Sequence, residues 1–392
     1  MKKNLIIIFL TVLVLGLCGY LVYNKVIDRK EIGNNNETTI ISDDKKQEIS
    51  LNEKFKDLYA FKIDNSSIYA LLTNGHEELL VNYKNDVCNN KECGTIEYEY
   101  INGVFYLYHI GSQDSTYSVN EKANVDVYSI DLTKEEIKAT KEYEISKNGE
   151  YIDTIKQDND AFYYVSFAPS ENENIGYNSK VFKYIKNTKE IQEVYDFKGY
   201  IVADDDAYGV LAVYNNNLYI VSDISYGHGS DSNQKIYNIN LNDNSVKTIA
   251  ENLFVSYYDN IENKIISKVQ GNKSLKIVNL KDLSINEVSE NEIIENRYYS
   301  IGNKLAYYVN TNTIKITGGN NYSIDLQKYT DKKIKENYSN LVLWSDYSVM
   351  AIVYLEGVNQ PEIFKINLNT GNVQKTDMTF DDINNCKYLY IK

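Results

Sequence analysis

The segment SYGHGSDSN gathers side chains that could do chemistry within one short polar loop. His228 stands between two glycines, and Ser230 and Asp231 follow it closely, which are the residue types of a Ser/His/Asp nucleophile system. Adjacent residues of one loop do not normally reach the geometry of such a triad, and the sequence contains no G-x-S-x-G element. We therefore expect a surface loop here and no catalytic centre.

Three consecutive carboxylates, Asp204, Asp205 and Asp206, stand in the segment VADDDAYG. Carboxylates near a glycine are typical of calcium-binding loops, but against the EF-hand spacing the fifth position is Tyr208 and the twelfth is Asn215. Two ligands are therefore missing, and we expect a solvated turn without a metal. The acidic balance of the chain leaves structural calcium elsewhere open, and no other cofactor is indicated.

Cys88 and Cys93 enclose four residues in the polar segment CNNKEC. Outside the cytoplasm such a pair can form a lasting disulfide, whereas a zinc site would need a second pair of ligands. We expect a disulfide that restrains this loop, with Cys386 left as an unpaired thiol.

The charge of the chain excludes several classes of function. Its 41 basic and 55 acidic residues give a formal net charge of −14, which argues against a nucleic-acid partner. Arg29 and Arg297 are its only arginines, so a sialidase-type arginine cluster cannot be built. A glycosidase needs only two or three carboxylates, but no acidic pair stands out in the predicted inner strands.

A strand pattern that recurs along the chain must position any such site. Hairpins resembling IYNINLNDNSVKTIA begin near Val127, Val181, Ile236, Leu275 and Ile363, and an apolar strand precedes each. Repeating units of four strands predict an all-β fold, a β-propeller of four-stranded blades. Seven units fit residues 55–392 best, with second strands starting near Ile68, Val104, Phe162, Leu218, Ile265, Leu305 and Val349, while six or eight units remain open. The first unit lacks an outer strand, and pairing it with the final strand KYLYIK would close the ring.

In this pattern of strands the chain resembles extracytoplasmic β-propellers of the TolB-like and YVTN-like kind over residues 55–392. It has neither the G-H and W-D pairs of WD40 blades nor a kelch pattern. The resemblance implies a platform for binding or scaffolding.

Residues 5–23 form an uninterrupted apolar run without charge, about 28 Å of helix and long enough to span a membrane. We expect residues 1–23 to form an uncleaved anchor rather than a signal peptide, and the bulky Leu17 before Cys18 argues against lipidation. Residues 24–54 are polar and lack an apolar period, so they predict a disordered tether. Lysines flank the run on both sides, but the strand-rich remainder and its cysteine pair place residues 25–392 outside the cytoplasm.

Three long loops, residues 111–124, 168–180 and 225–234, join the second and third strands of successive predicted units and should emerge on one face. Long loops clustered on a rigid scaffold are where binding sites usually lie. We expect a ligand or partner site formed by Asp114, Tyr117, Tyr177, Tyr226, His228 and Asp231. Tolerated loop insertion is the alternative explanation.

Together these features predict a membrane-anchored, extracytoplasmic β-propeller that binds an envelope protein or a wall-associated ligand without catalysis. The alternative is a carbohydrate-active hydrolase with carboxylates at the channel of the propeller. Inner-strand carboxylates 5–10 Å apart, on the order of the spacing in glycosidases, would favour the enzyme.

Overall fold

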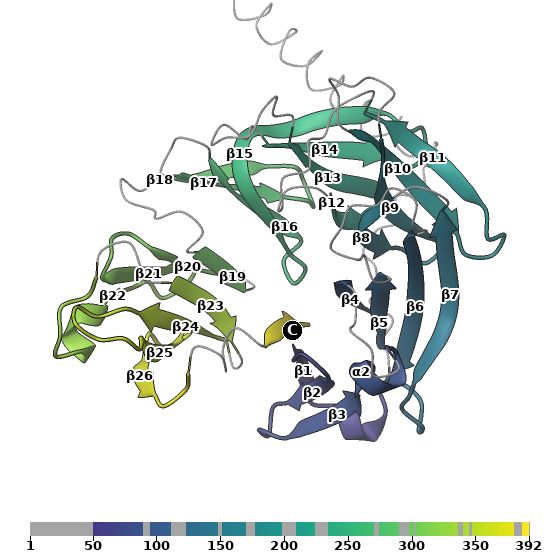
Figure 1. Ribbon diagram of the computed structural model, residues 1–392. Coiled ribbons are helices and arrows are strands. Elements are labelled where there is room, and N and C mark those ends of the chain that lie inside the picture. Colours follow the sequence, from purple (N-terminus) through teal and green to yellow (C-terminus); the bar gives the residue numbers. More distant parts are fainter. Residues whose placement is uncertain are drawn as a thin grey trace, which may run out of the picture. The chain divides into compact units, whose positions relative to one another are not determined.

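The computed structural model of the chain describes residues 50–88, 95–110, 123–147, 151–169, 177–197, 209–223, 234–269, 274–289, 298–301, 303–335, 340–344, 347–379 and 386–391. The chain divides into two units, Met1–Ile49 and Ser50–Lys392, and every described residue belongs to the second. In this described part the structure is all-β, with antiparallel sheets and three short helical turns (Figure 1). The turns are η1 (Glu53–Phe55), α2 (Tyr83–Asp86) and η2 (Leu326–Tyr329).

Five sheets within the described residues have four strands each. Sheet 1 has the order β27 (Lys387–Tyr390), β1 (Leu58–Ile63), β2 (Ile68–Leu72) and β3 (Glu77–Val81). Sheet 2 has β4 (Thr95–Ile101), β5 (Val104–Ile110), β6 (Ala123–Asp131) and β7 (Ala139–Lys147). Sheet 3 has β8 (Tyr151–Gln157), β9 (Ala161–Pro169), β10 (Tyr177–Ile185) and β11 (Ile191–Asp196). Sheet 5 has β19 (Tyr298–Ile301), β20 (Lys304–Tyr308), β21 (Thr313–Thr317) and β22 (Tyr322–Asp325), and sheet 6 has β23 (Asn340–Trp344), β24 (Ser348–Val353), β25 (Glu362–Asn367) and β26 (Val373–Thr376).

Sheet 4 has seven strands because one long strand serves two partners. Its order is β12 (Gly209–Tyr214), β13 (Asn217–Asp223), β14 (Gln234–Asn240), β15 (Val246–Asp259), β16 (Lys264–Val269), β17 (Ser274–Asn279) and β18 (Ile285–Ser289). The 14-residue β15, the long curved strand of Figure 1, pairs with β14 from Val246 to Leu253 and with β16 from Leu253 to Asp259. Sheet 4 is therefore two four-stranded parts that share β15.

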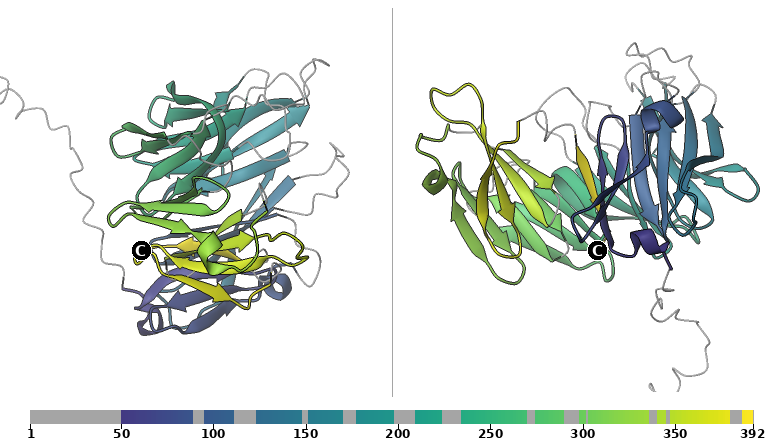
Figure 2. Two further views of the ribbon diagram at one scale, coloured as in Figure 1. Left: turned by 90° about the vertical axis from the view of Figure 1, so that its left-hand side faces the viewer. Right: turned by 90° about the horizontal axis from the view of Figure 1, so that it is seen from below.

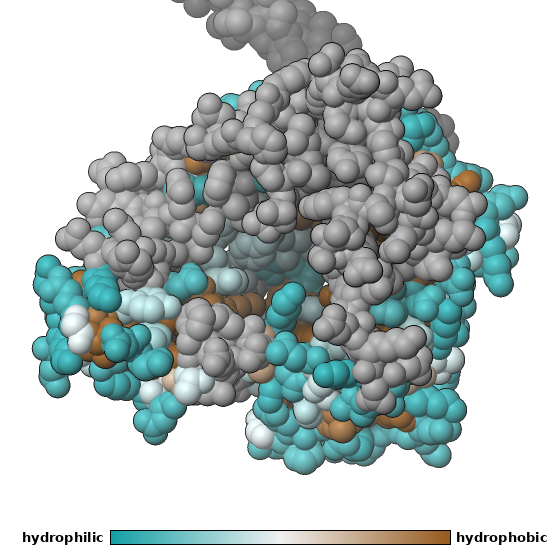
Figure 3. Space-filling model, viewed as in Figure 1, coloured by the Kyte–Doolittle hydropathy of each residue, from teal (hydrophilic) through white to brown (hydrophobic). Residues whose placement is uncertain are grey.

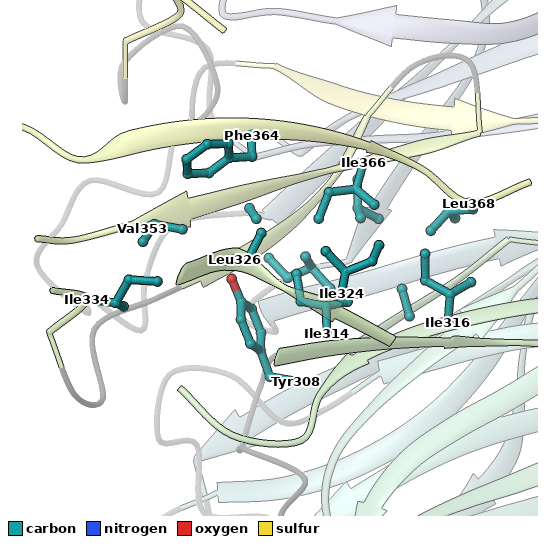
Figure 4. Packing of buried hydrophobic residues seen from close by; sticks show 14 of the residues in the cluster. Tyr308, Ile314, Ile316, Ile324, Leu326, Ile334, Val353, Phe364, Ile366 and Leu368 are labelled. Atoms are coloured by element: carbon teal, nitrogen blue, oxygen red, sulfur yellow. The ribbon is translucent and has the colours of Figure 1, made fainter. Parts of the chain in front are cut away.

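The sheets pack on one another in chain order through apolar side chains, and the last sheet packs on the first. The shared clusters join Phe61 to Phe105 between sheets 1 and 2, Tyr108 to Phe162 between sheets 2 and 3, Val165 to Val210 between sheets 3 and 4, and Ile266 to Leu305 between sheets 4 and 5. Another cluster joins sheets 5, 6 and 1 through residues such as Ile314, Val349 and Ala60. Figure 4 shows part of this last cluster, where Phe364 and Ile366 of β25 lie near Ile314, Ile316 and Ile324 of sheet 5.

Local sequence explains where the strands turn. Asn102 and Gly103 join β4 to β5 with φ angles of 51° and 83°, and Asn215 and Asn216 join β12 to β13 with 48° and 58°. Two successive residues with positive φ make the turn that matches the twist of a hairpin, and Asn and Gly adopt it readily. The outer hairpins turn differently, with one residue of positive φ each, such as Lys189, Asn244 and Gly371.

The predicted second strands near Val104, Phe162, Leu218, Ile265, Leu305 and Val349 correspond to β5, β9, β13, β16, β20 and β24, each beginning within one residue. The strand predicted near Ile68 is β2, but it is third in its sheet, because β27 stands before β1. The strand that the first unit lacks is therefore its first one, which β27 supplies, and not its outer one. The prediction of a missing outer strand is wrong.

The predicted pairing of the C-terminal strand with the first unit is confirmed. Residues 387–390 pair antiparallel with residues 60–63, and Figure 2 shows the yellow β27 beside the purple β1. The turn after β15 also reaches this strand, since Asn260 Nδ2 donates to the carbonyl oxygen of Tyr390 at 3.1 Å. Two parts of the chain 130 residues apart thus meet at β27.

No helix among the described residues is long and apolar enough to cross a membrane. The apolar run 5–23, on which the predicted anchor depends, lies outside the described residues.

Candidate functional site

The predicted loop site lies almost entirely outside the described residues. Asp114, Tyr117, Tyr226, His228 and Asp231 are not among them, and neither are Asp204, Asp205 and Asp206. Tyr177 begins β10 and pairs with Pro169 of β9. The loop site therefore stays a prediction.

Cys88 is disulfide-bonded and buried near α2, while Cys93 lies outside the described residues, so their pairing also remains a prediction. Within the described ranges no group of three or more His, Cys, Asp and Glu side chains is placed to hold a metal ion.

The exposed surface of the described residues offers no concentrated apolar patch of large side chains. The exposed large hydrophobic residues are Leu79, Ile191, Ile285 and Tyr329, which belong to β3, β11, β18 and η2. Figure 3 likewise shows a mainly hydrophilic surface where its atoms are coloured. Isolated residues of this kind are normal on a soluble surface, so they mark no docking site.

A pair of carboxylates on β4 forms the strongest candidate site. The strand reads TIEYEYI, and side chains of a strand alternate between its two faces. Ile96, Tyr98 and Tyr100 pack into the core between sheets 1 and 2. Glu97 and Glu99 therefore share the opposite face, toward sheet 3.

Both carboxylates bind the backbone of β8, the edge strand of sheet 3. Glu97 Oε2 accepts from the amide nitrogen of Ile155 at 3.2 Å, and Glu99 Oε2 accepts from that of Gln157 at 3.3 Å. These amides are two residues apart on one strand, a spacing of about 6.6 Å, so the two bound oxygens lie a similar distance apart. The carboxylates are thus held at a fixed separation.

Glu99 also belongs to a buried hydrogen-bond network. The hydroxyl of Tyr108 donates to Glu99 Oε2 at 2.9 Å, and Gln157 Nε2 donates to the same hydroxyl at 2.7 Å. Tyr108 is fully buried and Gln157 is 4% exposed, whereas Glu97 and Glu99 are half-buried. The network fixes Glu99 from the protein side.

Burial raises the pKa of both Glu97 and Glu99, because a low-dielectric surrounding disfavours the charged carboxylate. The ammonium group of Lys156 opposes this rise at both residues, and Lys387 of β27 opposes it at Glu97. The negative charge of Glu97 raises the pKa of Glu99 further. Paired carboxyls with perturbed pKa values are typical of acid–base catalysis.

The expectation that no acidic pair stands out in the inner strands is therefore wrong. The alternation of Glu and Tyr in TIEYEYI was the available signal, but a polar face on a strand ordinarily indicates solvent. Only the neighbouring sheet makes this face half-buried.

The same kind of contact, in which a side-chain oxygen accepts from a backbone amide of a neighbouring strand, occurs at two other places. Thr154 Oγ1 of β8 accepts from the amide nitrogen of Val210 at 2.6 Å, and the hydroxyl of Tyr257 accepts from that of Ser300. An edge strand presents unpaired backbone groups that need partners. The two glutamates therefore have a structural role as well as their chemical potential, and any test must separate the two.

No protein-family model matches the chain, and no curated protein matches it in sequence. Solved structures do resemble it. One, described in a study of two prolyl endopeptidases, is 12% identical with a TM-score of 0.47, over 86% of this chain and 51% of that one. A putative 6-phosphogluconolactonase from Bacteroides fragilis is 11% identical with a TM-score of 0.45, over 86% and 99% of the two chains. The β-propeller domain of the Trilobed protease from Pyrococcus furiosus is 10% identical with a TM-score of 0.42, over 80% and 90%.

The chain spans about half the length of the prolyl endopeptidase structure that it matches. The similarity to these structures is consistent with the β-propeller-like arrangement of sheets. It does not confirm the predicted resemblance to the TolB-like or YVTN-like kind. Their descriptions name enzymes, which contradicts the expectation of a non-catalytic binding or scaffolding module, and we do not retain it. At such low similarity they assign no activity to this chain, so its function must be argued from its own residues.

Proposed function

We propose that the protein is a hydrolase of glycosidic bonds, built on a seven-bladed β-propeller, in which Glu97 and Glu99 are the acid–base pair. The observation that carries the proposal is the shared, half-buried face of Glu97 and Glu99 on β4, held at fixed spacing by β8.

The number of four-stranded units among the described residues supports the proposal of seven blades. Sheets 1, 2, 3, 5 and 6 supply one each, and sheet 4 supplies two that share β15. The clusters that join each sheet to the next, and the last to the first, support closure into a ring. First strands face the axis in such a fold, so β4 would place the two glutamates at the channel.

The two glutamates have different surroundings, as glycoside hydrolysis requires. Glu97 has two lysines near it, Lys156 and Lys387, which favour its ionised form. At Glu99 burial favours the protonated form most strongly and the charge of Glu97 adds to this effect, while Lys156 and the hydrogen bonds from Tyr108 and Gln157 oppose it. We assign Glu99 as the general acid that protonates the leaving oxygen, and Glu97 as the base that activates water.

The separation of the pair indicates the stereochemical course. Inverting glycosidases hold their carboxyls about 6.5–9.5 Å apart to admit a water, and retaining ones about 5–5.5 Å. The β8 amides space the glutamate oxygens by about 6.6 Å. The proposal therefore specifies inversion at the anomeric carbon, which proton NMR of the first product distinguishes.

We also propose that residues 1–23 anchor the protein in the membrane, with residues 24–49 as a tether and residues 50–392, which form one compact unit that already includes η1, as a domain outside the cytoplasm. The uncharged run 5–23 supports this proposal. The wall-associated ligand expected from the sequence would then be the substrate. Deleting residues 5–23 should move the protein from the membrane fraction to the soluble one.

The activity test measures release of new reducing ends from a panel of cell-wall and storage glycans by the purified full-length protein. Glu99→Gln and Glu97→Gln keep an oxygen that accepts from the β8 amides, so they should fold normally. General acid–base catalysis contributes about 10²–10⁴-fold, and each variant should lose activity on that order.

Thr154→Val is the matched control, because it removes a contact between sheets and leaves both glutamates in place. It should retain the activity of the wild type if it folds. No turnover on any glycan, or full activity in both glutamine variants, would overturn the proposal.

A further inference from the structure

Lys186 lies at the far end of the hydrogen-bond network that reaches Glu99. It stands in the turn after β10, and its Nζ donates to Gln157 Oε1 at 2.7 Å. The same nitrogen donates to the carbonyl oxygens of Asp158 and Asn159, so all three of its protons have partners. It also lies 4.6 Å from the ring centroid of Phe162, a cation–π contact that holds it in place.

The direction of each bond in this network follows from the ammonium group. Lys186 can only donate, so the oxygen of the Gln157 amide must face it. The Gln157 nitrogen must then face Tyr108 and donate to the hydroxyl oxygen. The hydroxyl proton of Tyr108 is left to point at Glu99 Oε2, its acceptor at 2.9 Å.

Without Lys186 the amide of Gln157 could turn over at little steric cost, because its oxygen and nitrogen are similar in size. Its oxygen would then face Tyr108 and accept the hydroxyl proton. Glu99 would lose the hydroxyl of Tyr108, its only side-chain donor in this network. It would keep the hydrogen bond from the backbone amide nitrogen of Gln157.

We propose that Lys186 is a positioning residue, which acts through Gln157 and Tyr108 to keep a hydrogen bond directed at Glu99. This deepens the proposed function, and only its catalytic consequence rests on that function. The ammonium does not touch the reacting atoms. It keeps a donor on Glu99 that favours the ionised carboxylate and so opposes the effect of burial.

The charged and titratable groups that act on Glu99 come from several strands. Glu97 lies on β4, Tyr106 and Tyr108 on β5, Lys156 on β8, Lys186 after β10 and Tyr258 on β15. The positive charges of Lys156 and Lys186 also interact directly with Glu99, and this interaction lowers its pKa without any change in bond direction. The test must therefore separate the charge of Lys186 from its effect on bond direction.

The experiment titrates Glu99 by carbon NMR of the full-length protein labelled at glutamate carboxyl carbons, with its signal assigned by loss in Glu99→Gln. Lys186→Met should raise the pKa of Glu99 by about one pH unit, because a bond to a charged group is lost. Gln157→Met keeps the positive charge, and Tyr108 can still donate to Glu99. In the Gln157→Met background, Lys186→Met should raise the pKa of Glu99 by less, because only the charge of Lys186 is then lost.

Lys186→Arg keeps charge and donors and should leave the pKa near that of the wild type. If Lys186→Met does not fold, Lys186→Gln replaces it, since its amide tolerates both orientations of Gln157 and the same rise is expected. An equal rise with and without Gln157, or no rise in either background, would overturn the proposal. The NMR readout needs no turnover, so an inactive protein would count against the glycosidase and not against Lys186.

Discussion

Gly209 and Thr154 approach each other so closely that a Cβ atom on Gly209 would lie 2.0 Å from Thr154 Oγ1. The contact is where β8 of sheet 3 meets β12 of sheet 4, and the next residue, Val210, donates its amide to the same oxygen. Glycine is therefore required for close approach of the two sheets, not for an unusual backbone angle.

Gly209→Ala should lower the free energy of unfolding by about 1–3 kcal/mol or more, because overpacking forces the two strands apart. Denaturant unfolding followed by tyrosine fluorescence measures the change. Gly75→Ala is the comparison, since nothing lies within 4 Å of that added Cβ and only its φ of +84° opposes alanine. An unchanged stability of Gly209→Ala would show that the contact with Thr154 has no effect.

The difference in free energy of unfolding between Glu99→Gln and the wild type should be more favourable to the variant at pH 8 than at pH 5. The folded-state pKa of Glu99 lies above the ordinary value of 4.5, so the folded state holds the proton more tightly than the unfolded state. The stability from this linkage is fully present below the unfolded pKa and is lost as pH rises through the folded pKa. Glutamine cannot ionise and escapes that loss.

The measurement compares the free energy of unfolding of Glu99→Gln and the wild type at both pH values. Glu77→Gln, which replaces an exposed glutamate at the start of β3, is the control for the substitution itself. A stability difference for Glu99→Gln that does not change with pH would contradict the raised pKa.

Phe364→Ala should cost about 3–5 kcal/mol, because it leaves a cavity in the cluster that joins sheets 5, 6 and 1. Tyr329, whose ring centroid lies 6.4 Å from that of Phe364, is 47% exposed and is the matched position. Tyr329→Ala should cost clearly less. Chemical denaturation of the two variants decides, and a similar loss at both positions would refute the central place of Phe364 in this core.

Asp259→Ala should cost about 1–3 kcal/mol by leaving polar groups without their acceptor. Asp259 is 4% exposed, and its carboxylate accepts from Ser300 Oγ at 2.9 Å and from the amide of Ile261 at 3.0 Å. Asp259→Asn keeps an oxygen for the turn and should recover part of the loss. If the two variants are equally stable, the bonds of Asp259 do not hold the turn between β15 and β16.

Much of the strand pattern could be predicted from the sequence because it is local. Apolar alternation and Asn-rich turns placed β5, β9 and β13 within a residue of their starts. The order of strands within sheet 1 could not be found in this way. A strand such as 387–390 has the same local pattern whether it joins one edge of a sheet or the other, and only the tertiary partner decides.

The candidate site shows the same limit. Glu97 and Glu99 occupy an alternating polar face that in a single strand would indicate solvent exposure, whereas in the structure Glu97 binds the backbone of Ile155, 58 residues away. The long polar loops predicted to form a ligand or partner site, such as the loop that contains His228, lie outside the described residues. Spacing along a chain finds sites built within one element better than sites built between sheets.

The pairing of β27 with β1 sets an order on the production of this protein. Residues 60–63 pair on one side with residues 68–71 and on the other side with residues 387–390, the last described strand of the chain. Residues 387–390 are synthesised after the strands of every other described sheet, so sheet 1 stays incomplete while those sheets are already available to fold. A prematurely terminated chain would expose the edge of β1, and such an edge is where proteases and chaperones distinguish unfinished proteins from finished ones.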